Sequence, residues 1–144
     1  YRTPKDVEAK LELTPTLRLV KGAYAEPARV AHPKKADTDR AYEAIAGQML
    51  DAAARGHCLP IFGTHDVPML QRIIATARAK GVQAGQYEIH MLYGIRDAEQ
   101  QRLRAQGETV ATLISYGEAW YRWYMRRLAE RPANVGFVVR SMFG

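Results

Sequence analysis

Four short apolar runs, each followed by apolar residues at helical spacing, constrain the fold of this chain more than any other feature. The runs cover residues 16–20, 59–63, 86–93 and 109–115. A strand that is followed each time by a helix predicts a parallel sheet with helices packed outside it. A complete eightfold barrel takes about 250 residues, so four units in 144 residues predict half of an α/β barrel. A free-standing four-stranded sheet is the alternative, although no GxGxxG turn is present.

The expected helices begin and end at residues that commonly cap helices. They are a short one near Thr3, one over residues 37–55 capped by Asp37 or Thr38, one from Pro68 to before Gly81, and two over residues 96–106 and 118–131. A last apolar run near the end of the chain is expected as a short helix or coil.

Composition narrows the class of protein. One domain over residues 1–144 is long enough to bury a core. The formal charge of +6 and the pI near 9.6 suit an anionic ligand, a nucleic acid or an anionic membrane surface, but the charges are scattered and no nucleic-acid motif is present. The single cysteine, Cys58, excludes an internal disulfide and favours a reducing compartment. The chain begins at Tyr1 without Met, and we expect it to be a fragment.

The end of the first run carries a group of residues suited to an anion. Arg18 and Lys21 bring positive charge, Gly22 leaves the backbone open to a flat ligand or phosphate, and Tyr24 follows. The carboxyl ends of parallel strands are where ligands bind in such sheets. The stretch is therefore a candidate binding site.

Thr64 and His65 come directly after the second run. His65 could hydrogen-bond a ligand phosphate or carbonyl, or could cap the following helix, and the sequence alone favours the cap. His90 is interpreted as a strand residue that faces its neighbours. The four histidines and one cysteine lack the spacing of metal ligands, so no metal site is expected.

Arg126 and Arg127 are adjacent in the last expected helix. Adjacent positions diverge by about 100° around a helix, so the two guanidinium groups flank one side, and Glu130 can pair with either. Two oriented guanidinium groups suit a carboxylate, which each can bind bidentately. A solvated helix face with a surface ion pair is an equally good interpretation.

Four motifs taken in order resemble one family. They are Arg-Leu-Val-Lys-Gly-Ala-Tyr at 18–24, Thr-His-Asp at 64–66, Gln-Tyr-Glu with Leu-Tyr-Gly within 86–94, and Tyr-Gly with Tyr-x-x-x-Arg-Arg-Leu-x-Glu within 116–130. This order and spacing are similar to proline dehydrogenase, a flavoenzyme with a distorted (β/α)₈ TIM-type barrel. The resemblance implies oxidation of L-proline to Δ1-pyrroline-5-carboxylate, in proline breakdown to glutamate, with electrons passed through FAD to a quinone. The chain corresponds to about four carboxyl-terminal βα units.

The resemblance also implies roles for single residues. Arg18 would stabilise charge on the reduced flavin beside N5, and is the expected catalytic residue. The remaining FAD contacts would be Lys21, Gly22, Ala23, Thr64 and His65. The substrate residues would be Tyr24, with Arg126 and Arg127 gripping the proline carboxylate and Glu130 as their ion-pair partner.

The chain departs from the family pattern at three positions. Leu113 stands where a pocket tyrosine is usual, Trp123 replaces another tyrosine, and Gly63 replaces alanine. These departures motivate an alternative, a non-catalytic FAD- or anion-binding relative that has lost turnover. A nucleic-acid-binding domain is a third, weaker hypothesis.

The resemblance also implies partners. The catalytic aspartate, the substrate lysine and a flavin-contacting glutamine of the family come from earlier strands, so the chain needs the amino-terminal half of the barrel and is expected to be inactive alone. A cytoplasmic location is expected. Peripheral contact with the inner membrane is left open.

Overall fold

The computed structural model of the protein describes residues 2–21, 27–114 and 116–118. The helix expected over residues 118–131 and the last apolar run lie outside these residues, except for the coil residue Glu118. Strands and helices alternate along the chain after a first helix. Within the described ranges, no helix is long and apolar enough to cross a membrane.

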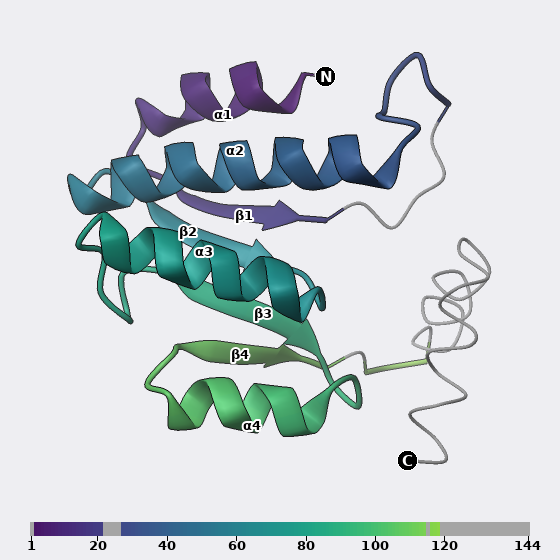
Figure 1. Ribbon diagram of the computed structural model, residues 1–144, viewed down its shortest axis with the longest axis vertical. Coiled ribbons are helices and arrows are strands. Elements are labelled where there is room, and N and C mark those ends of the chain that lie inside the picture. Colours follow the sequence, from purple (N-terminus) through teal and green to yellow (C-terminus); the bar gives the residue numbers. More distant parts are fainter. Residues whose placement is uncertain (1, 22–26, 115, 119–144) are drawn as a thin grey trace.

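Four strands form one parallel sheet in the order β1-β2-β3-β4 (Figure 1). They are β1 (Thr16–Val20), β2 (Leu59–Gly63), β3 (Glu88–Leu92) and β4 (Val110–Leu113). The first two match the predicted ranges, while the last two are shorter than predicted. The order follows the sequence, so every connection is a crossover through a helix. The fold prediction of repeated βα units is confirmed.

The helices are α1 (Thr3–Leu11), α2 (Lys35–Ala54), α3 (Val67–Ala79) and α4 (Asp97–Ala105). The predicted N-cap of α2, Asp37 or Thr38, was wrong by three or four residues. Lys34 is its N-cap residue and has no side-chain cap hydrogen bond, so Asp37 and Thr38 lie in the first turn. Asp37 still contributes a favourable negative charge near the helix N-terminus.

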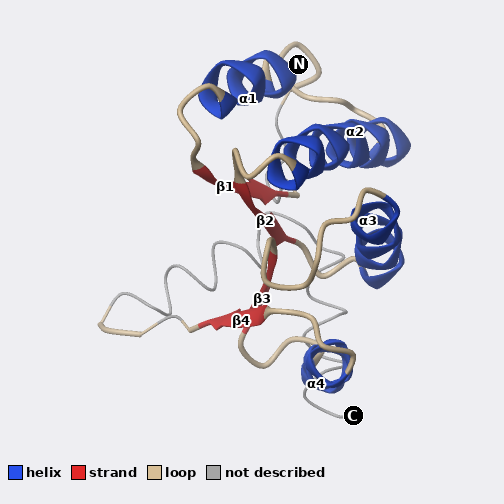
Figure 2. Ribbon diagram, turned by 90° about the vertical axis from the view of Figure 1, so that its left-hand side faces the viewer, coloured by secondary structure: helices blue, strands red, loops and turns tan. Residues whose placement is uncertain are grey.

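The helices cover one face of the sheet (Figure 2). Along each strand, alternate side chains point to this face, and those of Leu19, Phe62, Ile89 and Met91 are buried. The helices supply apolar residues at helical spacing to the same core: Tyr42, Ile45, Met49, Leu50, Met69, Leu70, Ile73, Ala77 and Leu103. The Tyr42 hydroxyl donates to the carbonyl oxygen of Leu19 at 2.9 Å, so α2 is tied to β1.

The opposite face of the sheet carries a different set of side chains, and none of the described helices packs on it (Figure 2). Arg18 is exposed and Val20 is 55% exposed. Ile61, Glu88, His90, Ala111 and Leu113 are partly exposed. We call this surface the open face. In a complete barrel it would line the interior.

Candidate functional site

Arg18 projects from β1 on the open face and reaches the neighbouring strand. Its Nε atom lies 3.4 Å from the point that a β-carbon on Gly63 would occupy. Gly63 pairs with Val20 on one side and with His90 on the other. Because Gly63 has no side chain, the Arg18 side chain can lie close to the sheet there. The Arg18 and Val20 side chains therefore cover Gly63, so a guanidinium group lies over the carboxyl end of β2.

His65 comes two residues after Gly63 and links the carboxyl ends of β2 and β3. Its Nε2 atom accepts a hydrogen bond from the backbone N–H of Leu92 at 2.9 Å. Burial, assisted by the charge of Arg96, lowers the pKa of His65 to about 4. The imidazole is therefore neutral at pH 7, and with Nε2 as acceptor its proton is on Nδ1. His65 offers one N–H donor without a positive charge.

The helix-capping role favoured for His65 was wrong, because Asp66 performs it. The Asp66 carboxylate accepts from the backbone N–H of Met69 at 3.2 Å and caps α3. The hydroxyl oxygen of Thr64, which is buried, accepts from the backbone N–H of Asp66 at 3.1 Å. Thr64, His65 and Asp66 therefore form one hydrogen-bonded turn, which we call the 64–66 turn.

Lys21 directly follows the last residue of β1, and its ammonium group points to the helix side of the sheet. Its Nζ atom lies 2.5 Å from Asp66 Oδ2 and 2.7 Å from Asp39 Oδ1. Lys21 and Arg18 are three residues apart in an extended chain, so their side chains leave on opposite faces. The structure thus places Arg18 beside Gly63 on the open face and directs the charge of Lys21 to Asp66, which is next to Thr64 and His65 in the turn.

Glu88 and His90 also lie on the open face and were not predicted as site residues. His90 Nε2 and Glu88 Oε2 are 2.8 Å apart. His90 Nδ1 is buried and has no partner among the described residues. The signal that could have found them is alternation, since both are out of phase with the buried residues Ile89 and Met91. The pair adds polar groups to the open face beside Gly63.

The other predicted site residues lie outside the described ranges. They are Gly22, Ala23, Tyr24, Arg126, Arg127 and Glu130. Their roles stay predictions.

The donor set of the open face suits a flat cofactor with acidic or carbonyl acceptor groups. Val20 and Ile61 offer apolar surface, and Arg18, which lies over Gly63, supplies a cation. His65 supplies a neutral donor at the edge. An isoalloxazine ring has this combination of a flat apolar body and polar edge, so the described residues fit FAD.

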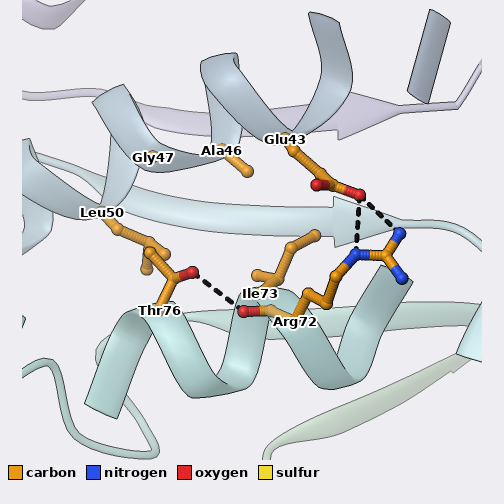
Figure 3. Close-up of a pocket in the computed structure, with 7 residues that line it drawn as sticks. All are labelled: Glu43, Ala46, Gly47, Leu50, Arg72, Ile73 and Thr76. Atoms are coloured by element: carbon orange, nitrogen blue, oxygen red, sulfur yellow. Dashed lines mark hydrogen bonds and ion pairs between the residues drawn. The ribbon is translucent and has the colours of Figure 1, made fainter. Parts of the chain in front are cut away.

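A small pocket lies elsewhere, between α2 and α3 (Figure 3). Its volume is about 30 Å³, which is room for one or two water molecules. Arg72 closes one end by donating to Glu43, and Thr76 donates to the carbonyl oxygen of Arg72. The pocket is a small gap between two packed helices and is too small to hold a cofactor.

The sequence is similar to known proteins of one family. The sequence matches the family model of proline dehydrogenase over residues 6–140. It is 42% identical to Proline dehydrogenase 2 of Bacillus subtilis (strain 168) and 40% identical to Proline dehydrogenase of Deinococcus radiodurans, in each case over 99% of this chain. The chain spans only 46% and 44% of the length of these two relatives.

A solved structure shares the fold. The crystal structure of proline utilization A (PutA) from Bdellovibrio bacteriovorus, inactivated by N-propargylglycine, matches 88% of this chain and 15% of that chain, with a TM-score of 0.77 and 23% identity. The four parallel βα units thus correspond to part of the barrel of that protein. The family match covers nearly the whole chain, and we conclude that this chain belongs to the proline dehydrogenase family.

Proposed function

We propose that this chain is the carboxyl-terminal half of the barrel of an FAD-dependent enzyme that oxidises L-proline to Δ1-pyrroline-5-carboxylate. The observation that carries the proposal is the match to the proline dehydrogenase family over residues 6–140. The reaction would be the first step of proline breakdown to glutamate. The chemistry that bound FAD supplies is acceptance of a hydride from the proline ring and delivery of the electrons to a quinone.

In this proposal Arg18 is the catalytic residue of the described part of the site. A guanidinium group on the open face would lower the energy of negative charge that develops on a flavin during reduction. The exposed side chain of Arg18 above Gly63 supports this role. Thr64 and His65 would contact the same cofactor from the end of β2, and Lys21, Gly22 and Ala23 from the end of β1.

The substrate would be held by residues outside the described ranges. Arg126 and Arg127 would grip the carboxylate of proline, Glu130 would pair with them, and Tyr24 would lie against the ring. Fork-shaped donors bind a carboxylate in a fixed orientation, so they would present one side of the proline ring to the cofactor.

The proposal requires further sequence. The curated relatives are more than twice as long as this chain, and the open face needs a second half-barrel to become an interior. We therefore propose that residues 1–144 act with an amino-terminal half and are inactive without it. We place the complete enzyme in the cytoplasm, where a quinone acceptor would bring it to the surface of the inner membrane.

A second candidate function is an FAD-binding relative without turnover. It is favoured by Leu113, which ends β4 on the open face where the family pattern has a tyrosine. A leucine preserves apolar contact but offers no phenol hydroxyl. If the hydroxyl is required for substrate orientation, the site would keep its cofactor and lose its reaction.

One experiment separates the two candidates. The complete barrel is purified, its visible absorption is recorded, and L-proline is added without oxygen, with L-alanine as a control. The proposed function predicts a flavin band that L-proline bleaches and L-alanine does not. A flavin band that L-proline leaves unchanged would support the second candidate, and the absence of bound flavin would contradict both.

A further inference from the structure

We propose that Lys21 is a positioning residue whose ammonium group joins the end of β1 to the 64–66 turn and so aligns the two segments that carry the proposed FAD contacts. The inference rests on the proposed function, because that proposal makes both segments cofactor contacts. In this inference the charge of Lys21 does not contact a phosphate of the cofactor.

Lys21 is held at its backbone and at the end of its side chain. Its backbone N–H donates to the carbonyl oxygen of Gly63 at 3.1 Å, which extends the β1–β2 pairing by one residue. Its Nζ atom contacts Asp66 at 2.5 Å and Asp39 at 2.7 Å, and the side chain is 12% exposed. Lys21 therefore fixes the end of β1, the strand that carries Arg18, against the end of β2.

Asp66 carries the connection to the second segment. One oxygen of its carboxylate caps α3 through the N–H of Met69, and the other accepts from Lys21. Its own N–H donates to the hydroxyl oxygen of Thr64. Through its carboxylate and its backbone N–H, this single residue thus links the start of α3, the Thr64 hydroxyl and the end of β1. Loss of the Lys21 contact would act directly on the residues next to His65.

The charges around Lys21 are balanced. Lys35 forms an ion pair with Asp39 and lies 3.5 Å from Asp66, so two lysines meet two aspartates. Burial alone would raise the pKa of both aspartates, but hydrogen bonds and charge from the lysines outweigh it and hold both pKa values below the usual range. Both carboxylates are ionised at pH 7 and neutralise the lysines. Little positive charge is left for a phosphate.

The test measures FAD binding in the complete barrel by the fluorescence of free flavin. The variants are Lys21→Met, Asp66→Asn and the two combined, because Asn still caps a helix but carries no charge. We expect each single variant to weaken FAD binding by about tenfold, and the combined variant to be no weaker than either. Binding of riboflavin, which has no phosphate, should weaken by the same factor.

A matched control exists at the other end of the same two helices. Lys80 in the C-cap of α3 pairs with Asp51 of α2, so Lys80→Met removes an ion pair between the same two helices away from the strand ends. At saturating FAD, Lys21→Met should alter the visible circular dichroism of the bound flavin, while Lys80→Met should leave it as in the wild type. If Lys21→Met does not fold, Asp66→Asn carries the same expectation.

Three results would overturn the inference. They are a loss that affects FAD but not riboflavin, losses in the two single variants that multiply in the combined variant, and unchanged FAD affinity in Asp66→Asn. Each would assign Lys21 to direct contact with the phosphates or to no role. Absence of FAD binding by the wild-type barrel would instead contradict the proposed function, so the two failures are distinguishable.

Discussion

The Nε atom of Arg18 lies 3.4 Å from where a β-carbon on Gly63 would stand. The same β-carbon would lie 3.3 Å from Cγ2 of Val20. The distance to Val20 is tighter than ordinary van der Waals contact and the distance to Arg18 is at its lower limit, so an alanine at this position would require Val20 to shift by a few tenths of an ångström and would press on Arg18. The glycine therefore helps to set the position of the guanidinium group on the open face.

Gly63→Ala should move Arg18 while leaving the fold intact. We expect the free energy of unfolding to change by less than about 1 kcal/mol, because reduced freedom of the unfolded chain offsets the crowding. The visible circular dichroism of bound FAD should change. Gly47→Ala is the matched control, since a β-carbon at Gly47 meets nothing within 4 Å. A flavin spectrum that is the same in Gly63→Ala and wild type would refute the role given to this glycine.

His65 should make stability depend on pH. Its pKa is lowered by burial and by Arg96 to about 4 in the folded protein, against an ordinary value of 6.5. Between these values the unfolded chain binds more protons, so stability falls as the pH falls from about 6.5 to 4. In His65→Asn the slope of unfolding free energy against pH should be smaller in this window. An imidazole that titrates near pH 6.5 by NMR in the folded protein would be inconsistent with this account.

Tyr87→Phe should destabilise the fold without affecting the site. The Tyr87 hydroxyl donates at 2.5 Å to Glu108, whose carboxylate is 2% exposed and also accepts from Arg78. Losing the hydroxyl leaves a buried carboxylate oxygen without this donor, which costs about 1–3 kcal/mol. Urea unfolding measures the loss, and Tyr93→Phe, on an exposed tyrosine, is the control. FAD affinity should be unchanged, because Tyr87 lies at the amino end of β3. A weaker affinity would place this network in the site.

Arg126→Lys and Arg127→Lys test the proposed grip on the substrate carboxylate. A lysine keeps the charge but loses bidentate hydrogen bonding, so each variant should weaken proline use by roughly 1.5–3 kcal/mol in kcat/KM. Arg102→Lys, at an arginine of α4 that pairs with Glu99, is the control. Steady-state kinetics with L-proline provide the measurement. Unchanged kinetics in both variants would remove these arginines from the pocket.

Much of the fold could be predicted from the sequence because its signals are local. The ranges of β1 and β2 were predicted to the residue, since each is a short apolar run bounded by turns. The start of α2 was not, because Lys34 begins the helix without a side-chain cap. In β3 the predicted range was too long, since Gln86 donates its N–H to Gln83 in a turn rather than to the sheet.

The site was less predictable because its key contacts join distant residues. Lys21 looked like a ligand for an anion, but its partners Asp39 and Asp66 are 18 and 45 residues away in the chain. The turn at 64–66 offered several capping residues, and only the structure shows that Asp66 caps α3 while His65 accepts from Leu92. The placement of Arg18 in a parallel strand, in contrast, followed directly from the βα pattern; Arg18 is the middle residue of β1, and its side chain reaches Gly63 at the carboxyl end of β2.

The reduction potential of FAD in Arg18→Met tests the central claim most directly, because that claim places the open face of β1 and β2 against the flavin. Removing a cation next to the flavin should make the two-electron midpoint potential more negative by about 30 mV or more, equivalent to about 1.4 kcal/mol. Arg40→Met, at an exposed arginine of α2 paired with Asp37, should leave the potential at the wild-type value. Equal potentials in Arg18→Met and the wild type would contradict the account.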